Sequence, residues 1–201
     1  MFRKILVTLL VLPGFVFLVK AGVADFLRLA PCSYIESIQH GARIYPTELF
    51  AAREQLLSAR QWDASNPIVP EFLAQIALIR YRLVSFSPKL QEMFLNEAID
   101  ELQRAIELRP NLPHLWAARM TAASWLIASN ARGVVDEALV KRELAAISIA
   151  LHQAYVLAPS EPMVLQQIAV VGRLHYSELS VEDRDVIDGA VEQAGKLNLK
   201  I

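Results

Sequence analysis

Proline-containing turns with the same layout recur along the chain, and they restrict it to helices joined by short connections. The turns read LRPNLP at residues 108–113, LAPSEP at 157–162 and WDASNP at 62–67, where Ala64 replaces the first proline. Proline suits the first turn of a helix but not its interior, so each turn ends one helix and begins the next.

The segments between these turns carry apolar residues at spacings of three and four, which is typical of a buried helix face. No long stretch alternates apolar and polar residues as a half-buried strand does. Breaks are expected near residues 66–67, 87–88, 111–113, 130–133, 160–162 and 177–180. The predicted fold class is therefore all-α, with about seven helices after the N-terminal segment.

Each helix that ends at one of these turns carries three residues of matching type at the same offsets. The sets are Ala52, Leu56 and Ala59; Ala98, Leu102 and Ala105; and Ile147, Leu151 and Ala154. A fourth set with the same spacing consists of Ile187, Val191 and Ala194. Small residues on facing helices let the backbones approach closely, so we expect Ala105 and Ala154 to be almost fully buried.

This pattern resembles the second helix of a tetratricopeptide repeat, in which small, large and small residues precede a proline. Positions that match the first helix of that repeat are Leu73-Ala74, Ile168-Ala169 and Trp116. The resemblance implies a tetratricopeptide-like stack of antiparallel helix pairs over residues 47–201. The alternative is an irregular helical bundle in which the alanine spacing arises by chance.

Two features depart from that family. Arg119 and Met120 replace a leucine and a small residue of its pattern. The final alanines of the four sets are spaced 46, 49 and 40 residues apart, against about 34 in the standard repeat. The additional residues fall around 81–92, 127–141 and 176–181, which predicts longer helices or larger turns on one edge of the stack.

Residues 1–29 are predicted to contain a membrane anchor. Arg3 and Lys4 precede an uncharged run that continues past Lys20 to Ala24. Because Lys20 can extend its ammonium to the interface, residues 5–24 are long enough to span a bilayer as a helix. A composition of 54% apolar residues and a mean hydropathy of +0.32 suggest that part of the chain lies in lipid. A signal peptide cleaved after Ala24 and a buried core helix are the alternatives.

The charges of Arg3 and Lys4 favour a cytoplasmic N-terminus, although Lys20 and Arg28 on the far side oppose this. We therefore expect a single-pass protein of the bacterial inner membrane with a periplasmic C-terminal domain. Residues 30–46 are predicted to form a connector with a brief helix from Ser33, followed by the repeat domain at 47–201.

Composition and motifs disfavour several function classes. The balance of 20 Lys+Arg against 21 Asp+Glu provides no basic stripe for nucleic acid. A single cysteine, Cys32, cannot form an internal disulfide or a cysteine-based metal site. None of the four histidines, His40, His114, His152 and His175, belongs to a metal-binding pair. No serine-hydrolase, phosphate or dinucleotide motif is present, so we expect no enzyme activity, metal or cofactor.

An acidic group near the C-terminus has a structural interpretation. Glu182, Asp183 and Asp185 follow Ser180, and the spacing of Ser180 and Asp183 is that of a capping box. Negative charge is favourable at the N-terminus of a helix. We therefore assign these residues to a helix start and not to catalysis.

In tetratricopeptide stacks the first helix of each pair lines a concave groove, so the resemblance implies a partner-binding site. The matching positions here are polar residues on otherwise apolar helices. They are Glu71, Gln75, His114, Thr121, Gln166, Gln167 and Arg173. The alternative is that these side chains only face water.

Together these features favour a non-enzymatic, membrane-anchored scaffold or adaptor of the bacterial cell envelope with protein partners. Small single-span proteins with such repeats in exopolysaccharide or surface-polysaccharide biosynthesis look similar to this chain, and the resemblance suggests that setting. The alternatives are a signal-cleaved, soluble periplasmic carrier or chaperone and an enzyme with an unrecognised site.

Overall fold

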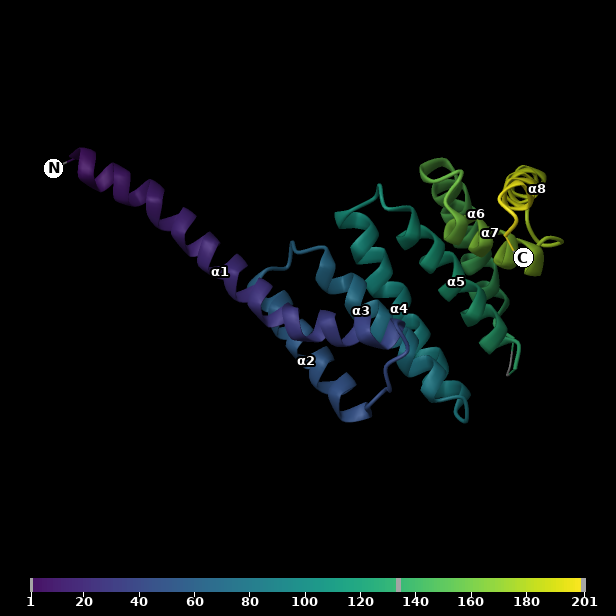
Figure 1. Ribbon diagram of the computed structural model, residues 1–201, viewed down its shortest axis with the longest axis horizontal. Helices are drawn as coiled ribbons and strands as arrows, with labels where there is room; N and C mark the ends of the chain where they lie inside the picture. Colours follow the sequence, from purple (N-terminus) through teal and green to yellow (C-terminus); the bar gives the residue numbers. More distant parts are fainter. Residues whose placement is uncertain (1, 133–134, 200–201) are drawn as a thin grey trace. The chain divides into compact units, whose positions relative to one another are not determined.

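The computed structural model of the chain describes residues 2–132 and 135–199, and for residues 2–14 it describes the backbone alone. All regular secondary structure in these ranges is helical (Figure 1). The helices are α1 (Phe2–Gln39), α2 (Pro46–Trp62), α3 (Ile68–Leu83), α4 (Pro88–Leu108), α5 (Pro113–Asn130), α6 (Glu137–Leu157), α7 (Pro162–Leu174) and α8 (Val181–Lys196). The all-α prediction is confirmed for the described part of the chain.

The predicted breaks lie at helix boundaries, and seven described helices follow α1. Proline occupies the first turn of α2, α4, α5 and α7, where its missing N–H leaves no intrahelical hydrogen bond unmade. Two of the remaining helices, α6 and α8, begin with side-chain caps. Asp136 accepts from the N–H groups of Ala138 and Leu139 at the start of α6, and Ser180 forms the predicted capping box with Asp183 at the start of α8.

The chain divides into two compact units, Met1–Ile76 and Ala77–Ile201. In the first unit α1 packs against α2. Side chains buried in this unit include Ala24 and Ile35 of α1 and Leu56 of α2. The earlier turns of α1 extend away from α2 (Figure 1).

α1 continues without a break to Gln39, so the brief helix expected from Ser33 is the end of a longer one. The reason is packing. Pro31, Cys32 and Ile35 are buried, and burial of this face favours continued helix over a new start at Ser33. Burial also raises the pKa of the Cys32 thiol to about 11, so the thiol is protonated at neutral pH.

No helix among the described residues is sufficiently long and apolar to cross a membrane. Part of the predicted span at residues 5–24 falls on residues 5–14, whose side chains lie outside the described part of the chain. The membrane anchor therefore stays a prediction.

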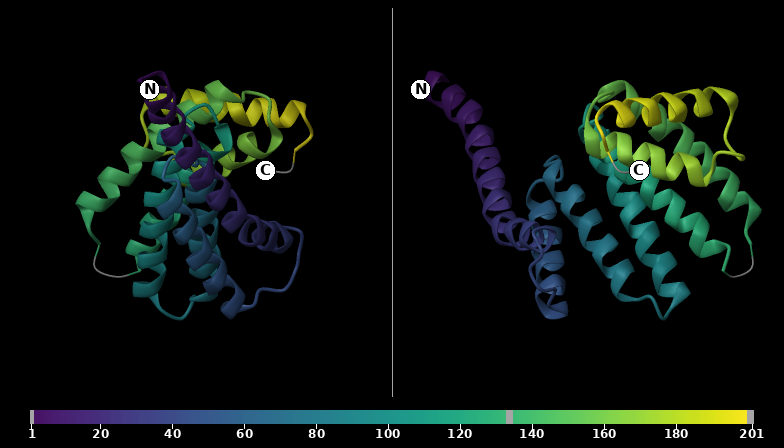
Figure 2. Two further views of the ribbon diagram at one scale, coloured as in Figure 1. Left: turned by 90° about the vertical axis from the view of Figure 1, so that its left-hand side faces the viewer. Right: turned by 45° about the vertical axis from the view of Figure 1, so that its right-hand side comes forward.

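In the second unit α5 is the central helix and packs against α4, α6 and α7 (Figure 2). α8 packs against α7 and α6. The rings of Tyr81 and Trp125 stack with centroids 5.3 Å apart and join the end of α3 to α5. The core of this unit includes Met120, Ile147, Leu151, Leu165 and Ile168.

The four sets of matching residues lie in the helix interfaces. Their final alanines, Ala59, Ala105, Ala154 and Ala194, all have an exposed fraction of 0%. The first two residues of each set are also buried, except that Val191 is partly buried. The burial predicted for Ala105 and Ala154 is confirmed.

Three of these alanines also accept the last hydrogen bond of their helix. The N–H groups of Asp63, Arg109 and Ala158 donate to the carbonyls of Ala59, Ala105 and Ala154 at 3.0, 2.9 and 3.1 Å. The φ angles of the three donors are −142°, −141° and −148°, and their ψ angles are 95°, 72° and 68°, so their backbone conformations are similar. α2, α4 and α6 therefore end in the same way.

A glycine allows a close approach of α7 to α8. A Cβ atom added to Gly172 would lie 2.5 Å from Cγ1 and 2.8 Å from Cδ1 of Ile187, the first residue of the fourth set. These distances are shorter than van der Waals contact, so the two helices can pack at this separation only without a side chain at residue 172.

We predict that Gly172→Ala lowers the free energy of unfolding, although alanine is the better helix former by about 1 kcal/mol. The reason is that overpacking against Ile187 costs about 1–3 kcal/mol. Urea denaturation measures the change, and Ile187→Ala provides the matched background because it removes the atoms that would clash. A Gly172→Ala variant that is stabilised equally with and without Ile187→Ala would contradict the close approach.

Candidate functional site

The predicted groove residues lie in both units. Glu71 and Gln75 lie on α3 in the first unit, and the second unit contains His114, Thr121, Gln166, Gln167 and Arg173 on α5 and α7. The Oε1 atom of Gln75 accepts from the Nε2 atom of Gln39 at 2.9 Å, so the end of α1 occupies that position. The hydroxyl of Thr121 donates to the Ala117 carbonyl in its own helix at 2.9 Å.

α7 has one buried face and one exposed face. The buried face includes Val164, Leu165, Ile168 and Ala169. The exposed face consists of Met163, Gln166, Val170, Arg173 and Leu174, and we call it the α7 face. Its three apolar side chains have exposed fractions of 63%, 46% and 68% for Met163, Val170 and Leu174. Two predicted groove residues, Gln166 and Arg173, therefore lie among large exposed apolar side chains.

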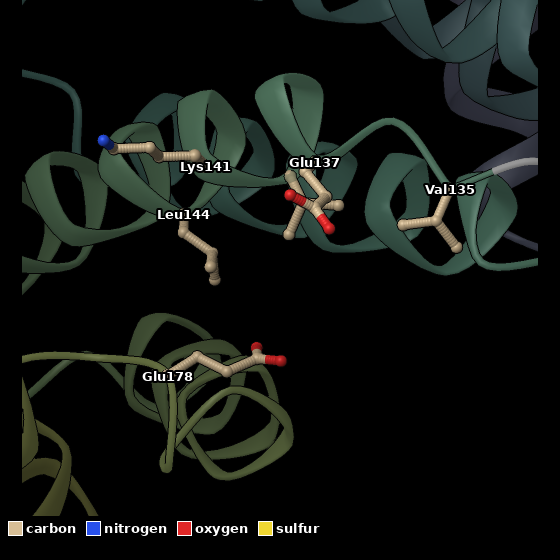
Figure 3. Close-up of a pocket in the computed structure, with 6 residues that line it drawn as sticks. Val135, Glu137, Lys141, Leu144 and Glu178 are labelled. Carbon is tan, nitrogen blue, oxygen red and sulfur yellow. The ribbon is translucent and has the colours of Figure 1, made fainter.

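A cavity of about 310 Å³ lies between the first turns of α6 and the connection from α7 to α8, and we call it the α6 cavity. Its lining residues are Val135, Glu137, Val140, Lys141, Leu144 and Glu178. Figure 3 shows Glu137 and Glu178 on opposite sides of it, while the Lys141 side chain extends away from both carboxylates. None of these residues was predicted as part of a site.

Behind Glu178 a chain of hydrogen bonds leads into the core. The Oε2 atom of Glu178 lies 2.8 Å from Nδ1 of His175, and Nε2 of His175 lies 2.9 Å from Oγ of Ser124 on α5. His175 and Ser124 are both buried. The order serine, histidine, carboxylate is also that of a nucleophilic triad.

The position of Ser124 argues against a nucleophilic role. Its exposed fraction is 4%, and the α6 cavity is lined by Glu178, at the opposite end of the chain of bonds. A nucleophile must reach its substrate, so this arrangement fits a bond network that ties α5 to the end of α7. The sequence carries no signal for this network, because Ser124 and His175 are 51 residues apart and share no motif.

A second network connects α6 to the start of α8 through the buried carboxylate of Asp183. Its Oδ1 atom accepts from Ser148 at 2.7 Å and lies 3.0 Å from Nε2 of His152. The Oδ2 atom of Asp183 accepts from the backbone N–H of Ser180 at 3.0 Å and from the Ser180 hydroxyl at 2.7 Å. Burial alone raises the pKa of Asp183, but the hydrogen bonds from Ser148, Ser180 and His152 outweigh it and lower the pKa below its usual value.

Arg119, which departs from the tetratricopeptide pattern, has a partner on the adjacent helix. Its Nη2 atom lies 3.0 Å from Oε2 of Glu143, and Arg142 lies 2.9 Å from Oε1 of the same carboxylate. Glu143 is buried, with a side-chain exposed fraction of 1%. A buried carboxylate needs such counter-charges, so Arg119 is explained by the contact of α5 with α6. Among the described residues, no group of three or more His, Cys, Asp or Glu is placed to hold a metal ion.

We predict that Asp183→Asn destabilises the protein most at neutral pH. Because the pKa of Asp183 is lowered in the folded state, its carboxylate stabilises the fold fully at pH values above its pKa in the unfolded chain, which is about 3.9. This stabilisation is lost as the pH falls through the pKa of the folded state. Loss of charge-assisted hydrogen bonds should cost about 1–3 kcal/mol at pH 7 and less at pH 3. Urea denaturation at both pH values measures it.

The matched control is Asp185→Asn, because Asp185 is an exposed acid in the first turn and a half of the same helix. It should change the stability little at either pH. Equal effects of the two substitutions would contradict the role assigned to Asp183.

Comparisons of the chain with protein-family models, with curated proteins and with solved structures found no match. No relative therefore supplies a role for any residue of this chain. The roles proposed below follow from the α7 face, the α6 cavity and the composition of α1.

Proposed function

We propose that the chain is a membrane-anchored adaptor of tetratricopeptide-like helix pairs that holds a protein partner on its α7 face. The observation that carries this proposal is the α7 face itself, where three large apolar side chains are exposed beside Gln166 and Arg173. Interfaces depend on a few large side chains at their centre, surrounded by polar groups that set the orientation.

The repeated local structure supports the helix-pair stack. Four helices carry the same buried set of residues, and three of them end with the same hydrogen bond to an alanine carbonyl. In addition, Nε1 of Trp116, the residue at the tryptophan position of the repeat, donates to the Pro110 carbonyl at 2.8 Å and fixes the turn between α4 and α5. Such repetition is expected when each unit packs only against its neighbours.

The exposed residues of α1 support the anchor. Phe15, Val16, Phe17, Leu18 and Val19 are five consecutive large apolar side chains, and all are exposed. Successive residues of a helix point about 100° apart, so these five cover all sides and cannot be buried by packing against one neighbouring helix. A lipid environment covers every side at once.

The partner of the α7 face is proposed to be a polypeptide segment with apolar side chains for Met163, Val170 and Leu174. An acidic group on that segment would pair with the exposed guanidinium of Arg173. α5 packs directly against α7, so His114 and Thr121 lie on the neighbouring helix and can extend the contact. The first-unit residues Glu71 and Gln75 are left out of this proposal.

The setting in the bacterial inner membrane, with a periplasmic domain and partners from polysaccharide assembly, follows from the charges around residues 5–24 and from the tetratricopeptide resemblance. A soluble periplasmic carrier released by cleavage after Ala24 is the second candidate. The two differ at the mature N-terminus, which mass spectrometry identifies as Met1 or Phe2 for an anchor and as Asp25 for a cleaved signal peptide.

We predict that the double substitution Val170→Ser and Leu174→Ser reduces partner capture at least about tenfold, because loss of two central apolar anchors costs an interface several kcal/mol. A photo-crosslinking amino acid at Gln166, expressed in the native host, measures capture as the yield of one discrete adduct. Circular dichroism checks that the helical content is unchanged.

The matched control is Ile149→Ser with Val156→Ser. These residues are also exposed and apolar, but they lie on α6, seven positions apart. Capture at Gln166 should survive this change. Undiminished capture by the α7 variant, or loss only in the α6 variant, would overturn the proposal.

A further inference from the structure

We infer that the α6 cavity binds the side chain of a lysine from another polypeptide, with its ammonium between Glu137 and Glu178 and its methylenes against the apolar wall. This inference goes beyond the proposed adaptor face, because the α6 cavity and the α7 face have no residue in common. Either can therefore fail without the other.

The shape and lining of the cavity suit a short apolar stem. Its volume of about 310 Å³ is at the lower end of the range for pockets that hold small ligands. Val135, Val140 and Leu144 form its apolar wall, and Leu144 points across the cavity toward Glu178 (Figure 3). Lysine has a four-carbon stem that packs on such surfaces while its charged end stays near water.

Two carboxylates approach this cavity from different elements. Glu137 lies in the first turn of α6, and Glu178 lies in the connection between α7 and α8. The two carboxylates repel each other, and each of them attracts a cation that lies between them. The charge at the cavity is therefore complementary to an ammonium group.

Lys141, which lines the cavity, does not place its ammonium group between Glu137 and Glu178. Glu137 and Lys141 have the helix spacing that favours an ion pair, with the acid on the N-terminal side. The described part of the chain nevertheless contains no ion pair between them, and Lys141 extends away from Glu137 (Figure 3). Glu137 is thus left to face the cavity.

Positively charged groups near the cavity would repel a bound cation, but most of them already interact with an acidic side chain. The free N–H groups at the start of α6 carry partial positive charge, but Asp136 accepts hydrogen bonds from two of them. His175 lies beside Oε2 of Glu178, which leaves Oε1 for a ligand. Lys141 is the remaining cation in the lining.

The test uses the full chain in detergent and two probes, N-acetyl-lysine amide and N-acetyl-norleucine amide, which share an apolar stem and differ in the ammonium group. NMR titration follows the signals of Val140, Leu144 and the His175 ring. We expect saturable shifts at these residues with the lysine probe and binding at least about threefold weaker with the norleucine probe.

Glu137→Gln and Glu178→Gln should each weaken binding of the lysine probe about two- to fivefold, as expected for partly exposed charge pairs. Glu182→Gln is the matched control, because Glu182 is an exposed acid in the first turn of α8 that does not line the cavity. Lys141→Gln should leave binding unchanged or tighten it. If Glu178→Gln unfolds the chain by removing the partner of His175, Glu137→Gln alone carries the test.

Three outcomes would overturn the inference. The first is no saturable shift with the lysine probe up to its solubility limit. The second is equal binding of the two probes, which would assign the cavity to apolar ligands. The third is an unchanged affinity in Glu137→Gln, or an equal loss in the Glu182→Gln control.

Discussion

Small residues at the helix interfaces let the helices approach closely, and this close approach determines where the other side chains lie. The final alanine of each of the four sets is fully buried, and Gly172 has no room for a Cβ atom beside Ile187. Helices this close have a fixed register, because side chains must interlock over a short distance. That register in turn places Ser148 and His152 of α6 on Asp183 and Ser124 of α5 on His175.

Local chemistry explains how far the sequence could predict this fold. Prolines and the Ser180 capping box act within a few residues, so the helix boundaries could be predicted from them. The burial of Ala105 and Ala154 could be predicted from the recurring spacing of small and large residues. The continuation of α1 past Ser33 could not, because it depends on packing against α2. The partners of His175 and Arg119 are likewise set by neighbouring helices and have no sequence signal.

The two proposed contact regions of the second unit differ in chemistry. The α7 face is an exposed apolar surface with one guanidinium, which suits an apolar segment with an acidic group. The α6 cavity is concave and acidic, which suits a single basic side chain. A helical scaffold can carry both because its interior is occupied by the small-residue contacts, so the outward positions are free to vary.

A larger side chain at one of the fully buried alanines reports on the close approach of the helices, and α6 provides its own control. Ala154 is buried at the helix interface, whereas Ala145 on the same helix is exposed. We predict that Ala154→Leu lowers the free energy of unfolding by about 1–3 kcal/mol, while Ala145→Leu changes it by less than about 0.5 kcal/mol. Equal effects of the two substitutions, measured by urea denaturation, would contradict an interface built on close approach.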